Sequence, residues 1–192
     1  MVGISGTPGT GKKTVSPIVA ELMGLPAPIS INSLARKGEV EADPAILRRR
    51  LLGLDPPPTV LFGHLLPHVL RKSEAGFVAV LRCEPSVLRG RLAERGYEKS
   101  KVTENVEAEL IGVVLDECVS GFGSGLVREY DTTSSAPREV ARQIARDAKA
   151  AEARRGGAER KARPWIDWTL RYDSSTKLRS LLEGRSDPPG ST

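Results

Sequence analysis

Short apolar runs alternate with longer amphipathic segments along most of the chain. Five runs, bounded by turn residues, have the length and composition of strands: residues 2–5, 28–31, 59–62, 77–81 and 126–130. Between them, apolar residues recur three or four positions apart, which predicts helices. The predicted helices span residues 12–23, 34–37, 44 to about 53, 85–94, about 102–120, and 137 to about 155.

This alternation predicts an α/β fold, with a five-stranded parallel sheet covered by helices on both faces. The run at residues 77–81 is apolar throughout, as expected for a strand that is buried on both faces. In such folds the ligand lies at the carboxyl ends of the strands. The residues that follow each strand are therefore the candidates for a binding site.

The first strand leads into a glycine-rich turn, Gly6-Thr7-Pro8-Gly9-Thr10-Gly11-Lys12. The spacing is that of a phosphate-binding loop (P-loop). Its glycines let successive N–H groups point at one anion, and the following helix adds its positive end. Lys12 is then placed to reach the outer phosphates of a nucleotide. An ordinary glycine-rich turn is the alternative, and the combination of strand, loop, lysine and helix disfavours it.

A dinucleotide site is a second alternative, but its motif needs a third glycine where this chain has Thr14. The P-loop pattern is itself imperfect. The residue after the lysine normally carries a hydroxyl for Mg²⁺, and here it is Lys13, with Thr14 about 100° further round the helix. We predict a nucleotide site formed by Gly9, Gly11, Lys12, Lys13 and Thr14, without a protein ligand for metal.

The charge is uneven along the chain of 192 residues. Ten of the basic residues and six of the acidic ones lie in residues 149–192, which gives this end most of the net charge of +5. We predict a P-loop domain at residues 1–155 and a basic extension at 156–192 whose end is disordered. The extension's basic run is either a solvated helix face or a contact for RNA phosphates, with a tryptophan stacked on a base. Alternatively, Trp165 and Trp168 dock on the core.

Other function classes find little support. No apolar segment reaches the roughly 18 residues of a membrane helix, and nothing resembles a signal peptide, so we expect a cytoplasmic protein. Cys83 and Cys118 each lie beside aliphatic residues. We interpret them as buried thiols rather than a disulfide or a metal site.

Several short motifs occur together in one order. They are the P-loop, Leu34-Ala35-Arg36, Gly63-His64-Leu65, Val80-Leu81-Arg82-Cys83, Arg95-Gly96-Tyr97 with Lys101 and Asn105, and Asp131-Thr132-Thr133. In these motifs the chain resembles the small archaeal and eukaryotic adenylate-kinase-like P-loop proteins linked to maturation of the small ribosomal subunit. The resemblance covers about residues 1–150.

The resemblance implies a nucleoside-monophosphate-kinase-like fold in which ATP binds the P-loop. An AMP-binding arm would span about residues 30–55, with Arg36 as one of its arginines. A short lid at about 95–105 would close over the phosphates. Arg95 resembles the lid arginine that stabilises the transferred phosphoryl group, and His64 matches the histidine of the family's Asp-x-His motif.

The chain also departs from that family. The aspartate of Asp-x-His is Phe62, and the P-loop hydroxyl is Lys13, so both groups that would hold Mg²⁺ are replaced. The arm looks about ten residues shorter. Two hypotheses follow. One is a weak phosphotransferase that converts ATP and AMP to ADP, with ATPase activity as a side reaction. The other is a nucleotide-binding assembly factor without kinase activity. In either case the extension would contact rRNA or a ribosomal protein.

Overall fold

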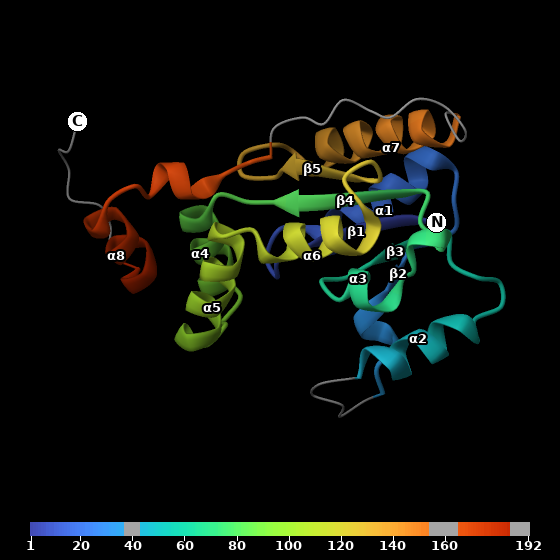
Figure 1. Ribbon diagram of the computed structural model, residues 1–192, viewed down its shortest axis with the longest axis horizontal. Helices are drawn as coiled ribbons and strands as arrows, with labels where there is room; N and C mark the ends of the chain where they lie inside the picture. The colour runs from blue at the N-terminus through green and yellow to red at the C-terminus, as the bar shows by residue number, and fades with distance from the viewer. Residues whose placement is uncertain (37–42, 154–164, 185–192) are drawn as a thin grey trace.

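A computed structural model describes residues 1–36, 43–153 and 165–184. Five strands, all parallel, form one sheet in the order β2-β3-β1-β4-β5. The strands are β1 Val2–Gly6, β2 Ile29–Ser30, β3 Val60–Phe62, β4 Phe77–Arg82 and β5 Val127–Asp131. The predicted fold class and all five predicted strands are therefore confirmed, with bounds shifted by one or two residues. β1 lies at the centre, so the loop that follows it is flanked by the ends of β3 and β4 (Figure 1).

Helices surround this sheet. The α-helices are α1 Lys12–Met23, α2 Pro44–Leu52, α3 Leu66–Val69, α4 Pro85–Glu94, α5 Lys99–Leu110, α6 Val113–Phe122, α7 Pro137–Ala153 and α8 Ser175–Glu183. The 3-10 helices are η1 Ile31–Leu34, η2 Lys72–Glu74 and η3 Trp168–Arg171. None of the helices in these described ranges is both long and apolar enough to span a lipid bilayer.

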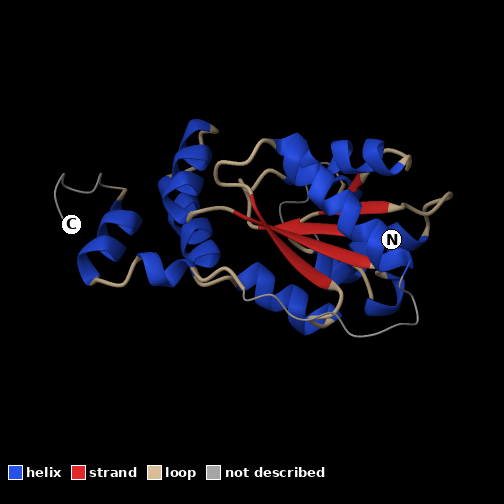
Figure 2. Cartoon of the chain, turned by 90° about the horizontal axis from the view of Figure 1, so that it is seen from above, coloured by secondary structure: helices blue, strands red, loops and turns tan. Residues whose placement is uncertain are grey.

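Helices cover both faces of the sheet, as Figures 1 and 2 show, and an apolar layer is buried on each face. On one face, α1 and α7 pack on residues such as Ile4 and Leu81. On the other face, α2, α3 and α6 pack on residues such as Leu61 and Val80. The strands alternate their side chains between the two layers, and both layers are apolar, which explains why β4 is buried along its whole length.

The predicted long helix over residues 102–120 is wrong. The structure has two helices, α5 and α6, separated at Gly112, whose φ of +74° is left-handed and ends the helical path. α5 also begins earlier than predicted, at Lys99, within the segment that the resemblance assigned to the lid. The predicted helix at 34–37 is likewise wrong over its described part, because Leu34 ends the 3-10 helix η1 and the next two residues are not helical.

The C-terminal segment adds a third apolar cluster against α4 and α5 (Figure 1). Trp168 is only 3% exposed and lies among Leu88, Leu92 and Val106, together with Leu181 of α8. Docking on the core is therefore confirmed for Trp168, and stacking on RNA is excluded for it in this arrangement. Trp165 is 39% exposed. The basic run between residues 154 and 163 and the end from 185 to 192 lie outside the described residues.

Candidate nucleotide-binding site

The P-loop links β1 to α1 at the carboxyl edge of the sheet. Gly6, Gly9 and Gly11 have φ values of +139°, +94° and +100°, a region that side chains other than glycine's rarely adopt. Packing adds to this requirement at two of them. A Cβ on Gly6 would lie 2.4 Å from the carbonyl oxygen of Leu81, and one on Gly9 would lie 2.6 Å from Cδ1 of Leu88. The loop is thus fitted against β4 and α4.

Lys12 is folded back onto this loop. Its Nζ donates hydrogen bonds to the carbonyl oxygens of Gly6 and of Thr7, the latter at 2.9 Å. Burial lowers the pKa of Lys12 to about 7, against the opposing effect of Glu109, and the positive charges of Arg95 and Lys13 lower it further. Positive charge is therefore concentrated beside the P-loop, and a bound anion would reduce the repulsion among these side chains.

Two other predicted site residues lie near Lys12. His64 follows β3 and is half-buried, and burial and then the charge of Lys12 lower its pKa. Arg95 is the exposed C-cap residue of α4. The fold therefore brings Lys12, Lys13, His64 and Arg95 from separate parts of the sequence to one edge of the sheet. Their roles toward phosphate stay predictions.

A cavity of about 180 Å³ opens beside the P-loop. The loop residues Gly9 and Gly11 and the helix residue Thr14 form one wall, and Arg91 and Arg95 form another. Its remaining lining residues come from the loop, from α1 and from the segment after β5: Thr10, Val15, Thr132, Ser135, Pro137 and Val140. The cavity adjoins the loop's amides, so it has the position that the nucleoside of a P-loop-bound nucleotide would need.

The sequence motifs did not single out Arg91, which supports the wall of this cavity. Its Nη2 donates to the carbonyl oxygens of Thr132 and Thr133, at 2.7 and 2.9 Å. Thr132 in turn donates from Oγ1 to the carbonyl oxygen of Thr10, at 3.0 Å. The segment after β5 is thereby fixed to the P-loop. Arginine in a helix is too common for its position alone to have revealed this.

The predictions about the AMP arm and about Mg²⁺ concern residues that are outside this cluster or at its surface. Arg36 is exposed after η1 and borders residues 37–42, which the structure does not describe, so its role toward AMP stays a prediction. Phe62 is 9% exposed in the sheet, and Lys13 is exposed at the start of α1. Neither side chain is of a kind that binds a metal ion. Within the described ranges no three His, Cys, Asp or Glu residues form a group that could hold one.

Glu109 was also missed. It is 1% exposed and accepts a hydrogen bond from the P-loop residue Thr7, at 2.5 Å. A signal existed in the sequence, since an acidic residue lies next to the apolar stripe of Val102, Val106 and Leu110. The two cysteines are buried and free, as expected, and burial raises the pKa of Cys83 to about 11 and that of Cys118 to about 12.

Comparison with known proteins agrees with this geometry. Residues 2–112, which hold the P-loop, Arg95 and α5, match a family described as "AAA domain". The chain belongs to this family of P-loop proteins. Among its relatives is a protein of Thermococcus onnurineus named "Putative adenylate kinase", 35% identical over 193 residues, which cover 94% of this chain and 98% of the relative.

Other archaeal relatives of this P-loop protein carry the same name. One from Methanothermobacter thermautotrophicus is 41% identical over 155 residues, covering 73% of this chain and 85% of its own. One from Pyrococcus abyssi is 34% identical over 182 residues, covering 90% of this chain and 93% of its own. The matches to the Thermococcus and Pyrococcus proteins cover 94% and 90% of this chain, so each extends beyond the residues that match the family model.

Proposed function

We propose that this P-loop protein binds ATP and transfers its terminal phosphoryl group to AMP, which yields two molecules of ADP. The observation that supports the proposal is that His64 and Arg95 lie close enough to Lys12 for their charges to affect one another, next to a P-loop that borders a cavity of about 180 Å³. The names of the archaeal relatives support the same reaction.

The proposed roles follow from the requirements of phosphoryl transfer, in which catalysis is mostly positioning and charge stabilisation. A phosphate oxygen of AMP attacks the γ-phosphorus of ATP, and the bond to the β,γ-bridging oxygen breaks, leaving ADP. The loop amides and Lys12 hold the β- and γ-phosphates. Arg95 is exposed at the end of α4 and can approach the transferred group when substrate binds. His64 orients the phosphates or the attacking oxygen.

The residues present do not fit a magnesium ion held by the protein, because Lys13 and Phe62 occupy the relevant positions. We propose that the ammonium of Lys13 supplies part of the charge neutralisation, so that nucleotide binding depends little on Mg²⁺. ATP titrated with Mg²⁺ and with EDTA should give similar dissociation constants. The variant Lys13→Thr, which restores the usual hydroxyl, should become more dependent on Mg²⁺. A large loss of affinity of the unmodified protein in EDTA would contradict the proposal.

The activity is tested by following ADP formation from ATP and AMP. We expect a measurable rate that Lys12→Ala reduces by about 10- to 100-fold, since a hydrogen bond to a charged group contributes about 1.5–3 kcal/mol. Lys177→Ala, on α8, is the matched control and should leave the rate unchanged, because this lysine pairs with Asp173 at the surface. Equal rates for the unmodified protein and Lys12→Ala would reject the kinase function.

The replacements at Lys13 and Phe62 also favour a second candidate, a nucleotide-binding assembly factor for the small ribosomal subunit that has little kinase activity. This candidate is supported if the protein binds ATP, forms ADP no faster than background, and co-purifies with components of the small subunit.

RNA binding by the basic extension is part of either candidate. Because Trp168 is docked on the core, truncation would confuse the effect on RNA binding with a loss of packing. Replacing Arg160, Lys161 and Arg163 by alanine is cleaner. RNA affinity should fall and become less sensitive to salt, by a slope of up to about 0.7–0.9 for each phosphate that the variant no longer neutralises. An unchanged slope would argue for a solvated basic face.

A further inference from the structure

A buried cluster of charges lies directly behind the P-loop. Arg82, at the end of β4, is 2% exposed, and Glu109 of α5 is 1% exposed. Nε of Arg82 lies 2.7 Å from Oε1 of Glu109, and Nη1 of Arg82 lies 2.7 Å from Oε2 of Glu129 on β5. Buried ions are stable only when each one keeps its partners. The cluster therefore fixes the relative positions of the groups that surround it.

One side of the cluster holds the P-loop. Thr7 donates from Oγ1 to Oε2 of Glu109, at 2.5 Å. The carbonyl oxygen of the same Thr7 accepts from Nζ of Lys12 at 2.9 Å and from the backbone N–H of Thr10 at 3.2 Å. A change in the position of Thr7 would thus move the lysine and the loop amides that are proposed to bind phosphate.

The other side of the cluster holds the C-terminal segment. The indole Nε1 of Trp168 donates to Oε1 of Glu109 at 3.3 Å. The backbone of Ile166 completes the pairing: its N–H donates to Glu129 at 2.9 Å, and its carbonyl oxygen accepts from Nη1 of Arg82 at 3.3 Å. Further along, the hydroxyl of Tyr172 donates to Glu84, the N-cap residue of α4.

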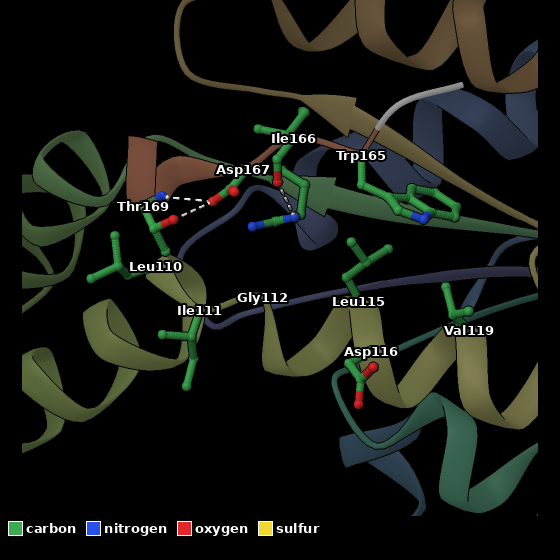
Figure 3. A pocket seen from close by; sticks show the side chains of 11 residues that line it. Leu110, Ile111, Gly112, Leu115, Asp116, Val119, Trp165, Ile166, Asp167 and Thr169 are labelled. Atoms are coloured by element: carbon green, nitrogen blue, oxygen red, sulfur yellow. Dashed lines mark hydrogen bonds between the residues drawn. The ribbon is translucent and has the colours of Figure 1, made fainter. Parts of the chain in front are cut away.

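A cavity of about 430 Å³ lies between the C-terminal segment and α6, so the two are not in continuous contact there. Figure 3 shows Ile166 of the C-terminal segment on one side of the open space and Leu115 of α6 on the other, while the carboxylate of Asp167 is directed toward Thr169. Near this cavity the segment is held by the charged cluster and by the burial of Trp168, and further along by Leu181 and by the hydrogen bond from Tyr172 to Glu84. The charged cluster is the part of this attachment that also reaches the P-loop, through Glu109 and Thr7.

We propose that residues 166–172 belong to the framework of the nucleotide site, and that Glu109 and Trp168 act as positioning residues for the P-loop through Thr7. The inference rests on the proposed binding of nucleotide at that loop. Coupling between two sites is reciprocal. Docking of the segment should increase the affinity for ATP, and bound ATP should in turn stabilise the docked segment.

Three variants of the full chain test the proposal. Trp168→Phe keeps an aromatic ring in the core but loses the indole N–H, and Thr7→Val keeps the shape of the side chain but loses the hydroxyl. Trp165→Phe is the matched control, because Trp165 is exposed and lies just outside the segment. Calorimetric titration with ATP, at a temperature where each variant is folded, should show an affinity about 5- to 10-fold weaker for the first two. The control should change by less than about twofold.

Hydrogen exchange of the ligand-free proteins gives a second readout, because coupling changes exchange in the distant segment, whereas a loss of local packing changes it around the substitution. Thr7→Val should speed the exchange of amides in residues 166–172, and Trp168→Phe should speed that of residues 7–12. ATP affinities within about twofold for both variants, with exchange altered only around each substitution, would overturn the proposal. If the unmodified protein binds no ATP, the proposed function fails, and the exchange pattern alone decides whether the segment and the loop are coupled.

Discussion

Lys12 is the residue whose chemistry the fold alters most clearly within the candidate site. Enclosure beside the loop lowers its pKa to about 7, from 10.5 for the free side chain. A bound polyphosphate favours the ammonium form, so it raises this pKa again. Above pH 7 the ligand-free protein has largely lost the proton that the complex needs, and nucleotide affinity should fall as the pH rises further.

Calorimetry of nucleotide binding checks this prediction. At pH 8, titrations in two buffers of different ionisation enthalpy should reveal uptake of up to about one proton per bound nucleotide. Lys12→Met keeps much of the side-chain volume without the amine, so the proton uptake that belongs to Lys12 should disappear in it. An equal proton uptake by the two proteins would show that Lys12 is already charged before nucleotide binds.

Arg95 should affect the reaction rate more than binding, since it lies exposed at the end of α4. We expect Arg95→Ala to slow ADP formation by about 1,000-fold or more, the effect typical of an arginine that stabilises a transferring phosphoryl group. The dissociation constant of ATP should change by less than about tenfold. Arg142→Ala, an exposed residue on α7, controls for the loss of a positive charge. A rate loss matched by an equal loss of affinity would assign Arg95 to ground-state binding instead.

At the scale of elements, the break between α5 and α6 depends on one glycine. A Cβ at Gly112 would meet the guanidinium of Arg82 at an ordinary 3.7 Å, so the cost of substitution comes from its φ of +74°. We expect Gly112→Ala to destabilise the protein by about 1–2 kcal/mol. Gly90→Ala, inside α4 with open space around it, should stabilise by about 0.5–1 kcal/mol. Thermal unfolding of both variants measures the difference, and similar effects in the two would refute it.

The same break shows what the sequence could predict. Hydrophobic spacing located the strands, and the spacing of glycines and lysine located the P-loop, because both depend on local pattern. It could not locate the end of α5, since a glycine inside a helical pattern is often tolerated. It also could not reveal that Glu109 meets Arg82 and Trp168, because those partners are distant in sequence and only the packing of α5 on β4 brings them together.

At the scale of the whole molecule, the C-terminal segment is part of the packed structure and not only a charged appendage. Trp168 fills the cluster between α4 and α5, whereas Trp165 is partly exposed. We expect Trp168→Ala to destabilise the protein by about 3–5 kcal/mol, and Trp165→Ala by much less. For a chain of this length the first should lower the unfolding temperature by about 6–20 °C. Equal shifts for the two variants would mean that the docking of Trp168 adds no stability.

The close approach of Gly6 to β4 means that a P-loop glycine is not, by itself, evidence of nucleotide binding. A side chain at position 6 would push β1 and β4 apart, whatever the protein binds. A related protein that no longer bound nucleotides would still need this glycine for β1 and β4 to pair. The packing around Gly6 and Gly9 therefore accounts for part of the glycine pattern, and the positive side chains of Lys12, Lys13 and Arg95 are better evidence for nucleotide chemistry.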